Sequence, residues 1–497
     1  MNTKKLLAGA AVLAMMTGAA LAQSNKVFLD QVGNDNVADI TQSGSGNMAG
    51  ATGANTRRMD QSGDNNTLVI LQSGSNNEIG TTNSGGGLGL NQIGDRNSAT
   101  ITQSAVDGFV NVVQQTGAAG ATETTNSLTI TQEASALAGA SGNLGRFGNV
   151  ISRVEQTNTG SGTSAGDVNS VTISQDRSTA GGPGGFGDNV IGFAGSGNPA
   201  VGGNRSDSSA RVGGGVVQNG TANTASLSQD GEKNGIRGLS QTGAGNAGTL
   251  SQDGVENRIN DVVQSGDNNV LTISQTGNRN GTSGFASGGL ANIGVSQGDA
   301  LQTGDRNTIS YTIANNNDNS FGFEQDGNDN VISGTSLFGD GNELAALQTG
   351  DGNTVTFVHD GSGNVIGVIQ TGNDNIASPI IDGDDNLVGI SQIGSANAFA
   401  LDIAGDRNGG NRSFGANAAG SVGLTAGLFE QTGISNAFDG SVTGNDNVLA
   451  SRQTGDDNDI VGTVNGSFNQ IAVSQFGNGN VADFSTTGSF NVIGISQ

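Results

Sequence analysis

The chain contains no cysteine and few cationic or aromatic residues, and each shortage excludes a class of protein. Without cysteine, no disulfide, thiol nucleophile or thiolate metal site can form. Lys and Arg number 19 against 44 Asp and Glu, so the formal net charge is −25. Such an acidic chain is a poor partner for nucleic acid or anionic membrane surfaces. Hydrophobic residues make up 33% and aromatic residues 4%, which is too little for conventional globular cores in a chain of 497 residues.

Long apolar runs are also missing, apart from one at the N-terminus. Two lysines precede an apolar segment at residues 6–16, and the small-x-small motif Ala20-Leu21-Ala22 comes just before Gln23. This order is typical of a secretory signal peptide, and the apolar segment is short for a bilayer span. We therefore expect residues 1–22 to be a signal peptide cleaved between Ala22 and Gln23. The mature chain is expected to be secreted, without membrane insertion.

Histidine is nearly absent, and the sequence carries no recognisable catalytic constellation. The single histidine, His359, has no serine partner at a spacing known from nucleophilic sites. It stands where the repeat described below otherwise has Gln, so we expect it to replace Gln in that position. We expect no enzymatic activity and no cofactor. Paired aspartates such as Asp456 and Asp457 match neither the nine-residue calcium repeat nor the EF-hand loop, and whether they bind calcium stays open.

Glycine and amide side chains are abundant, and their spacing is regular. Glycine accounts for 86 residues, and the pattern Q-x-G-x-x-N recurs along the chain. Near the C-terminus, glycines at 433, 444, 455, 466, 477 and 488 lie eleven residues apart, whereas Gln453, Gln475 and Gln497 lie twenty-two apart. The repeating unit is therefore about twenty-two residues long and consists of two similar halves.

Each half has the form N-x-h-x-h-x-Q-x-G-x-x, where h is apolar, as in Asn469-Ile471-Val473-Gln475. The spacing of two is the period of a β-strand, and Gly with Asn, Asp or Ser is typical of tight turns. These features predict an all-β fold, a β-solenoid of strand-turn-strand rungs with two facing parallel sheets. Repeated amides can then donate to one neighbouring rung and accept from the other. Residues expected in these ladders are Gln31, Asn36, Gln42, Gln72, Gln370, Gln453, Asn458, Asn469, Gln475, Asn480, Asn491 and Gln497.

The regularity of the repeats varies along the chain. Repeats are expected at residues 23–103, 218–280, 302–408 and 430–497, and they are interrupted by Gly-rich insertions at 104–217. Residues 281–301 and 409–429 read as further Gly-rich insertions. We place the insertions at turns, where solenoids tolerate extra residues. Pro379 falls inside a strand segment and predicts a local defect or a strand with a free N–H side.

At this point the residues resemble the curlin repeat. Residues 31–42 carry Gln31, Gly33, Asn36, Ala38 and Gln42 at the offsets of that family. The resemblance implies a subunit of curli-like amyloid fibres on the bacterial surface, which serve adhesion and biofilm formation. It further implies self-association, a nucleator and export through an outer-membrane pore. The chain has more repeats than the familiar subunits, so a major, nucleating or accessory role stays open.

A second function remains possible: a monomeric secreted β-solenoid acting as an adhesin or as a binding surface for ice or carbohydrate. A flat ice-binding face would need a regular outward array of Thr, and the outward positions Val37, Asp39 and Thr41 vary. The sequence ends on a complete strand pattern, residues 491–497, without a polar cap. End-to-end templated stacking at residues 27–42 and 475–497 is therefore the favoured expectation.

Overall fold

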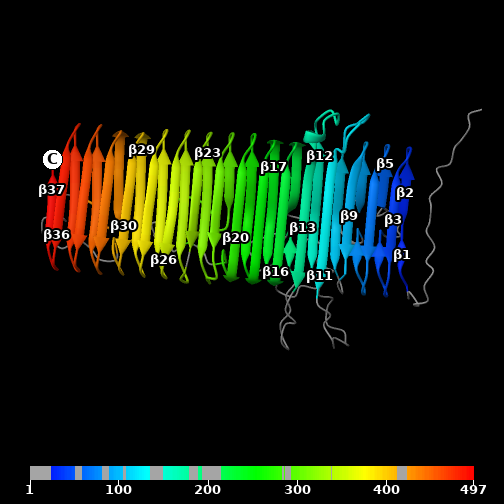
Figure 1. Cartoon of the computed structure of the whole chain (residues 1–497), viewed down its shortest axis with the longest axis horizontal. Coiled ribbons are helices and arrows are strands. Elements are labelled where there is room, and N and C mark those ends of the chain that lie inside the picture. The colour runs from blue at the N-terminus through cyan, green and yellow to red at the C-terminus, as the bar shows by residue number, and fades with distance from the viewer. Residues whose placement is uncertain are drawn as a thin grey trace, which may run out of the picture. The chain divides into compact units, whose positions relative to one another are not determined.

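The computed structural model describes residues 24–50, 59–80, 89–104, 108–134, 149–177, 189–192, 214–282, 285, 293–336, 338–410 and 423–497. They form two compact units, unit 1 ending at Ala247 and unit 2 beginning at Gly248. In both units the described residues are strands and tight turns, with one short 3-10 helix at Ala165–Asp167 (Figure 1). No helix in these residues has the length and apolarity to cross a bilayer. The signal peptide expected at residues 1–22 and its cleavage site lie outside the described residues.

Unit 1 contains two parallel sheets. Strands of sheet A are β1 (Lys26–Val27), β2 (Leu29–Val32), β4 (Met48–Ala49), β5 (Met59–Ser62), β7 (Glu78–Ile79), β8 (Leu90–Ile93), β10 (Phe109–Thr116), β12 (Val150–Asn158), β14 (Val190–Ile191), β15 (Gly215–Thr221) and β17 (Gly235–Ala244). Strands of sheet B are β3 (Val37–Gln42), β6 (Thr67–Gln72), β9 (Asn97–Gln103), β11 (Asn126–Ala134), β13 (Asn169–Arg177) and β16 (Thr224–Glu232).

Unit 2 has the same two-sheet construction. Its sheet A contains β19 (Arg258–Ser265), β21 (Ala300–Thr303), β23 (Ser320–Asp326), β25 (Glu343–Thr349), β27 (Val365–Thr371), β29 (Leu387–Ser395), β31 (Leu428–Ile434), β33 (Val448–Thr454), β35 (Gln470–Phe476) and β37 (Val492–Ser496). Its sheet B contains β18 (Ala247–Val255), β20 (Val270–Asn278), β22 (Thr308–Ile313), β24 (Val331–Ser336), β26 (Thr354–Asp360), β28 (Ile376–Asp382), β30 (Ala398–Ala404), β32 (Ala437–Thr443), β34 (Asp459–Asn465) and β36 (Val481–Thr487).

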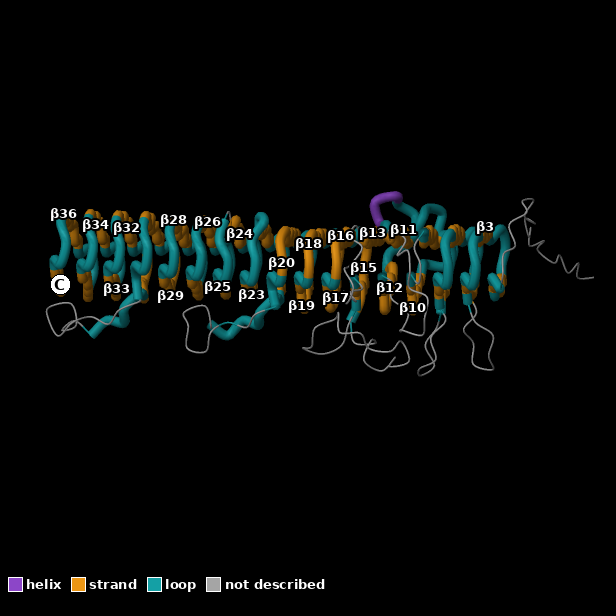
Figure 2. The backbone as a smooth tube through the Cα atoms, turned by 90° about the horizontal axis from the view of Figure 1, so that it is seen from below, coloured by secondary structure: helices purple, strands orange, loops and turns teal. Residues whose placement is uncertain are grey.

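The strands alternate between the two sheets along the chain, so each rung contributes one stretch to sheet A and one to sheet B. Strand neighbours are therefore one rung apart, and they pair in parallel: Gln348 aligns with Gln370, and Val355 with Ala377. Within each unit the two sheets face one another (Figure 2). The expected β-solenoid with two parallel sheets is confirmed.

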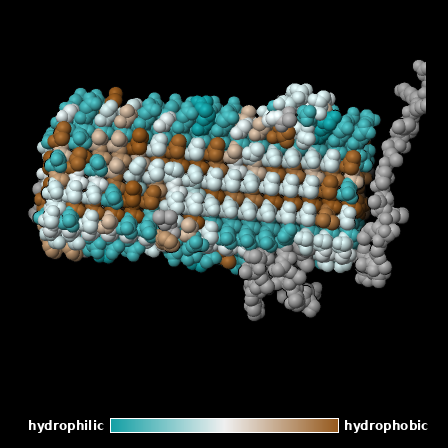
Figure 3. Space-filling model, in the orientation of Figure 1, coloured by the Kyte–Doolittle hydropathy of each residue, from teal (hydrophilic) through white to brown (hydrophobic). Residues whose placement is uncertain are grey.

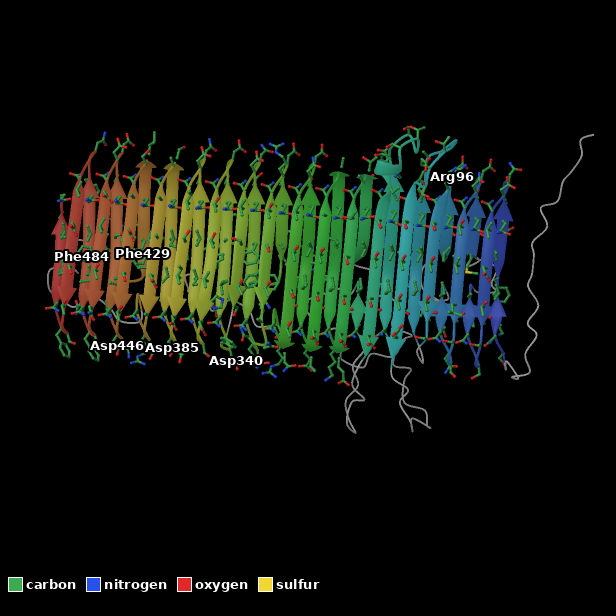
Figure 4. All side chains as sticks on the ribbon, viewed as in Figure 1. Arg96, Asp340, Asp385, Phe429, Asp446 and Phe484 are labelled. Atoms are coloured by element: carbon green, nitrogen blue, oxygen red, sulfur yellow. The ribbon has the colours of Figure 1, made fainter. Side chains whose placement is uncertain are left out.

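Alternate residues of every strand point into the narrow space between the sheets. Phe323 of sheet A packs against Phe357 of sheet B with ring centroids 6.3 Å apart, and both are fully buried. Further along unit 2, Phe429 of sheet A meets Phe438 of sheet B at 5.2 Å. Phe429 is one of the labelled side chains that reach into this space (Figure 4). A thin, continuous apolar layer of this kind needs few large residues per rung, which agrees with the low hydrophobic content.

The glycine of each turn is required by the distance between rungs. Gly383 has φ +138, and a Cβ added there would collide with the backbone carbonyl oxygen of Gly405 in the next rung. Two residues later Asp385 adopts the left-handed conformation, with φ 56. Glycine adopts positive φ without steric cost, and Asp and Asn tolerate the left-handed region better than most residues. This explains the turn sequence Gly-x-Asp/Asn-Asn.

Many insertions lie inside strands of sheet A, and the expectation that they fall at turns is wrong for these. Strand β12 pairs through Ile151 with β14 and through Val154 with β15, although residues 193–213 separate those two short strands. The rungs containing β4 and β5, and β7 and β8, are divided in the same way. In unit 2, Gly409 pairs with Val448 while Phe429 pairs with Ser451. The chain can leave and re-enter a strand here because the neighbouring rung holds both pieces in register.

Other features of the interruptions agree with the sequence. Strands β11 and β13 run unbroken to Ala134 and Arg177, and the insertions expected after them, at residues 135–148 and 178–188, lie outside the described residues. Pro379 lies inside β28, where the registered pairs with β26 skip from Ala377 to Ile380. The expected local defect is therefore present, and the strand continues beyond it.

Candidate functional site

Columns of glutamine run along sheet A. In unit 2, Gln348 Nε2 donates to Gln370 Oε1 at 2.8 Å, and Gln370 Nε2 donates to Gln392 Oε1 at 2.7 Å. Every bond points toward the higher-numbered rung, through Gln264, Gln302, Gln325, Gln348, Gln370, Gln392, Gln431, Gln453, Gln475 and Gln497. The second amide hydrogen also has a partner, since Gln370 Nε2 donates to the backbone oxygen of Thr354 in sheet B at 3.0 Å. A buried Gln in such a column is fully satisfied.

Columns of asparagine are polarised in the opposite direction. Asn386 Nδ2 donates to Asn364 Oδ1 in the preceding rung at 3.1 Å, and the Asn386 backbone N–H donates to the same oxygen at 3.0 Å. Asn386 Nδ2 also donates forward, to the Gly405 backbone oxygen at 2.9 Å. Each Asn therefore joins the rung below through its side chain and the rung above through a turn carbonyl. The columns add side-chain bonds to the backbone ladder at the two edges of the core.

The structure places the expected ladder residues in such columns, with Gln42 and Gln72 in a Gln column of sheet B. In unit 1, Gln31 donates to Gln61 and Gln42 donates to Gln72, each at 2.6 Å, and Asn66 donates to Asn36 at 3.1 Å. In unit 2 the remaining residues are joined as follows: Gln453 to Gln475 at 3.2 Å, Gln475 to Gln497 at 3.0 Å, Asn480 to Asn458 at 2.8 Å and Asn491 to Asn469 at 2.9 Å. None forms a localised cluster, because each lies one rung from its partner.

The register of the last strands agrees with the alternation in the sequence. Ile460, Val473 and Gln475 are buried, and Asp457 and Asn478 are exposed. Asp456, expected to be exposed, is half-buried. Its Oδ1 accepts the backbone N–H of Ile434 at 2.9 Å, which holds the side chain against the preceding turn.

His359 occupies the Gln position of sheet B without joining a ladder. The Gln column of this sheet reaches Gln275, and its next members are Ile313 and Ser336. His359 follows between Ser336 and Ile381, fully buried, and neither ring nitrogen has a hydrogen-bond partner. Burial lowers the pKa of His359 from 6.5 to about 4, so the ring is neutral at physiological pH. The expectation that His359 replaces Gln in a ladder is therefore wrong, because an amide neighbour is missing on both sides.

Turn carboxylates have a structural role that the sequence did not indicate. Asp384 Oδ1 accepts the backbone N–H of Ser362 at 2.7 Å, and Asp406 Oδ1 accepts that of Asp384 at 3.0 Å. Figure 4 shows Asp340, Asp385 and Asp446 at these turns, which lead from sheet B to sheet A in unit 2. The signal for this role is the recurrence of Asp, Asn or Ser directly after the turn glycine.

Some turns also carry ion pairs between rungs. Nε and Nη2 of Arg306 each donate to the Asp329 carboxylate at 2.7 Å, and this hydrogen bonding holds the pKa of Asp329 below its usual value. Arg407 pairs with Asp446 in the same way. In the part of the chain that the structure describes, no group of three or more acidic or His side chains is arranged to hold a metal ion.

The outer face of sheet B in unit 1 is more regular than Val37, Asp39 and Thr41 indicated. On β9, β11, β13 and β16, all three outward positions between the ladder Asn and the ladder Gln are Ser or Thr, as in Ser127, Thr129 and Thr131 of β11. Neighbouring strands align these positions one to one. We call this set of four strands by three positions the hydroxyl array. Near-neutral rows run along the face seen in Figure 3, and the array contributes part of them. The variation used against a regular outward face is therefore confined to β3 and β6.

Comparison with known proteins identifies one sequence family. The model of the curlin associated repeat matches residues 22–52. No curated protein matches the chain. The matched segment includes β1 to β3, which form the first described rung, and β4, which pairs with β1 from the next rung. It contains the ladder residues Gln31, Asn36 and Gln42. The same strand pairing and amide columns continue through both units. Residues 22–52 are therefore similar to the curlin associated repeat.

Proposed function

We propose that this chain is a structural subunit of extracellular amyloid-type fibres that grow by stacking of rungs from successive copies. The observation that carries the proposal is that each rung binds the next through three sets of groups: backbone pairs, Gln columns and Asn columns. Any rung that ends a stack presents the same set. A rung of another copy can satisfy all three at once, which is templated growth.

The geometry of the columns supports head-to-tail addition. Gln side chains donate toward higher-numbered rungs, as Gln370 does to Gln392, and Asn side chains donate toward lower-numbered rungs, as Asn386 does to Asn364. One end of a stack therefore offers Gln donors and the other offers Gln acceptors. An incoming copy in the same orientation matches both columns, whereas a reversed copy would place donor against donor.

Cellular roles follow from the similarity of residues 22–52 to the curlin repeat and are part of this proposal. A curlin-repeat subunit would be exported to the cell surface, and the signal peptide expected at residues 1–22 supports secretion. Adhesion, biofilm formation, a nucleator and an outer-membrane pore are the roles and partners that this function requires. We propose no catalytic role, since His359 is enclosed in the core.

Fibre formation by the purified full chain tests the proposal. Electron microscopy is expected to show unbranched fibres, and fibre diffraction should give spacings of about 4.8 Å along the axis and about 10 Å across it. The double variant Ile493→Pro, Ile495→Pro removes two N–H donors on the side of β37 that pairs with β35, where Gln497 N–H donates to Ser474. The end rung should then be poorly held as a template and elongation should slow, whereas Ile493→Leu with Ile495→Leu should elongate normally. A chain that stays monomeric, or proline variants that elongate at the wild-type rate, would contradict the mechanism.

The hydroxyl array favours one second candidate, a monomeric solenoid that binds ice or a carbohydrate surface. A flat array of Ser and Thr offers donors and acceptors at regular spacing. The two candidates differ in solution behaviour. The fibre subunit is expected to assemble without added ligand, whereas a monomeric binder should remain monomeric and be retained by ice or by an insoluble polysaccharide.

A further inference from the structure

The hydroxyl array is an uncharged surface on a strongly acidic chain. Its central column, Thr100, Thr129, Thr172 and Ser226, is in register across four strands, and the columns on either side are also Ser or Thr. The chain as a whole carries a formal net charge of −25. The acidic column Glu133, Asp176 and Asp230 lies beyond the ladder Gln, at the margin of the array. Two copies therefore repel through their turns, and the array is a face on which close approach brings no carboxylate against another.

The strands of this face are unbroken, and the loop that carries the helix Ala165–Asp167 projects on the same side beyond one end of them (Figure 2). Other insertions interrupt strands of sheet A, and in unit 2 described residues of one of them lie on the outer side of that sheet, where Val295 packs on Ala345, with Phe285 and Ile293 beside it. Strands β9, β11, β13 and β16 of sheet B, by contrast, run without interruption. Thr129, Thr172 and Ser226 are exposed. Insertions divide strands of sheet A, whereas the four array strands of sheet B are continuous.

Hydroxyl groups make such a face complementary to itself. Each donates one hydrogen bond and accepts two, so two identical arrays can pair without a separate set of donors. Within the equivalent face of unit 2, the hydroxyls of Ser333 and Thr356 on neighbouring strands lie 3.2 Å apart, so one hydroxyl of such a face can serve as the partner of another. Aromatic side chains, which usually provide platforms for sugars, are missing from the array strands. The chemistry thus favours a second copy over carbohydrate.

We infer that the hydroxyl array is the lateral contact between two fibres of this chain, array against array. The inference rests on the proposed fibre function. Four strands about 4.8 Å apart and about five residues long give an array of roughly 300 Å². A stable pair of proteins buries about 800 Å² per partner, so one array cannot hold two monomers together. In a fibre the array recurs with every copy, and the contacts add along the axis. Lateral pairing therefore follows elongation.

Charged substitutions at the centre of the array test this inference in the full chain. Thr172→Glu and Thr172→Lys each place like charges on both faces, and each should reduce paired filaments about tenfold or more. The Lys variant distinguishes face pairing from general repulsion. It lowers the net negative charge, so repulsion between whole chains decreases, but it still places two cations against each other where the arrays meet. The matched control is Thr242→Glu, an exposed Thr on sheet A of the same unit. Filament width by electron microscopy and the fraction sedimenting at low speed measure pairing, and growth from seeds measures elongation.

The outcomes separate the two proposals. Single filaments from both Thr172 variants, with elongation within about twofold of wild type and normal pairing by Thr242→Glu, support the inference. Three outcomes overturn the inference and leave the fibre function intact. The Thr172 variants still form paired filaments, the wild-type filaments never pair, or Thr242→Glu reduces pairing as much as the Thr172 variants do. A wild-type chain that forms no fibres overturns both. Retention of the monomer on ice or cellulose, lost in Thr172→Glu, assigns the array to that ligand and overturns lateral pairing.

Discussion

At the scale of single residues, the stability of a buried polar side chain depends on which residues occupy the same position in the rungs above and below it. Gln370 is stable in the core because Gln348 and Gln392 flank it, and His359 lacks partners because Ser336 and Ile381 flank it. A buried position in this fold is therefore not necessarily an apolar one. A buried amide is favourable in a column and unfavourable alone.

The turn glycines provide a first prediction. Gly383→Ala is expected to lower the free energy of unfolding by about 3 kcal/mol, because the methyl group meets the Gly405 carbonyl and the residue has positive φ. Gly341 also has positive φ, +71, but an added Cβ would have nothing within 4 Å. Gly341→Ala should therefore cost only about 1 kcal/mol. Urea denaturation of both variants measures the difference, and equal losses would show that rung spacing is not the constraint.

His359 provides a second prediction, on pH. Its folded pKa is about 4 and its ordinary value is 6.5, so between these values the unfolded chain binds more protons than the folded one. Stability should then fall as pH falls through this window, by up to about 3 kcal/mol. His359→Leu removes the two unpartnered nitrogens and should gain about 1–3 kcal/mol at neutral pH. Its advantage over wild type should widen toward pH 4 in urea titrations, and a constant difference would contradict the burial effect.

At the scale of the element, the rung is the unit that the sequence encodes most clearly. The alternation in Asn469-Ile471-Val473-Gln475 fixes which residues face the core, and the eleven-residue spacing of the turn glycines fixes the strand length. Both follow from local geometry, since a strand has period two and a tight turn needs glycine. The β-solenoid and its amide columns could therefore be predicted from one chain.

Two features of the elements could not be predicted in the same way. Sheet A strands divided by insertions, such as Met48–Ala49 and Met59–Ser62, leave pieces too short to show the strand period. Only their pairing with the strands of neighbouring rungs shows that the two pieces belong to the same rung. The hydroxyl array is likewise invisible until β9, β11, β13 and β16 are aligned, because their spacing along the chain is irregular. Both features depend on contacts between rungs rather than on local sequence.

Two substitutions test whether a buried amide is stabilising only within a column: one removes a Gln from the column of sheet A, and the other introduces a Gln into sheet B where no column exists. Gln370→Leu leaves the Gln348 amide hydrogen and the Gln392 carbonyl without their partner, so it should cost about 2–4 kcal/mol although the new side chain is apolar. Ile381→Gln places an amide between His359 and Ile403, where no ladder exists, and should be destabilising by a similar amount. Urea titrations of the two variants measure both effects. If Gln370→Leu is neutral, the ladders do not contribute to stability.

At the scale of the whole molecule, the ladders that favour stacking are opposed by charge. The formal net charge is −25, many of the aspartates lie at turns, and corresponding turns recur from rung to rung. Some of this charge is neutralised between rungs, as by Arg306 beside Asp329 and Arg407 beside Asp446. The remainder keeps separate copies apart in solution while leaving the core unaffected. Net charge acts here on association rather than on the fold.

Assembly should therefore accelerate whenever this repulsion is reduced. Raising the salt concentration from about 0.1 M to about 1 M shortens the screening length from about 10 Å to about 3 Å, so the lag before fibre growth should shorten. Lowering the pH toward the isoelectric point of about 4.1 should act in the same direction as carboxylates take up protons. Asp329 should be among the last to lose its charge, because its hydrogen bond to Arg306 lowers its pKa. Light scattering at matched protein concentration measures the lag. Lag times that are unchanged by salt at neutral pH would show that charge does not limit the encounter of copies, and that formation of the first rung-to-rung contact does.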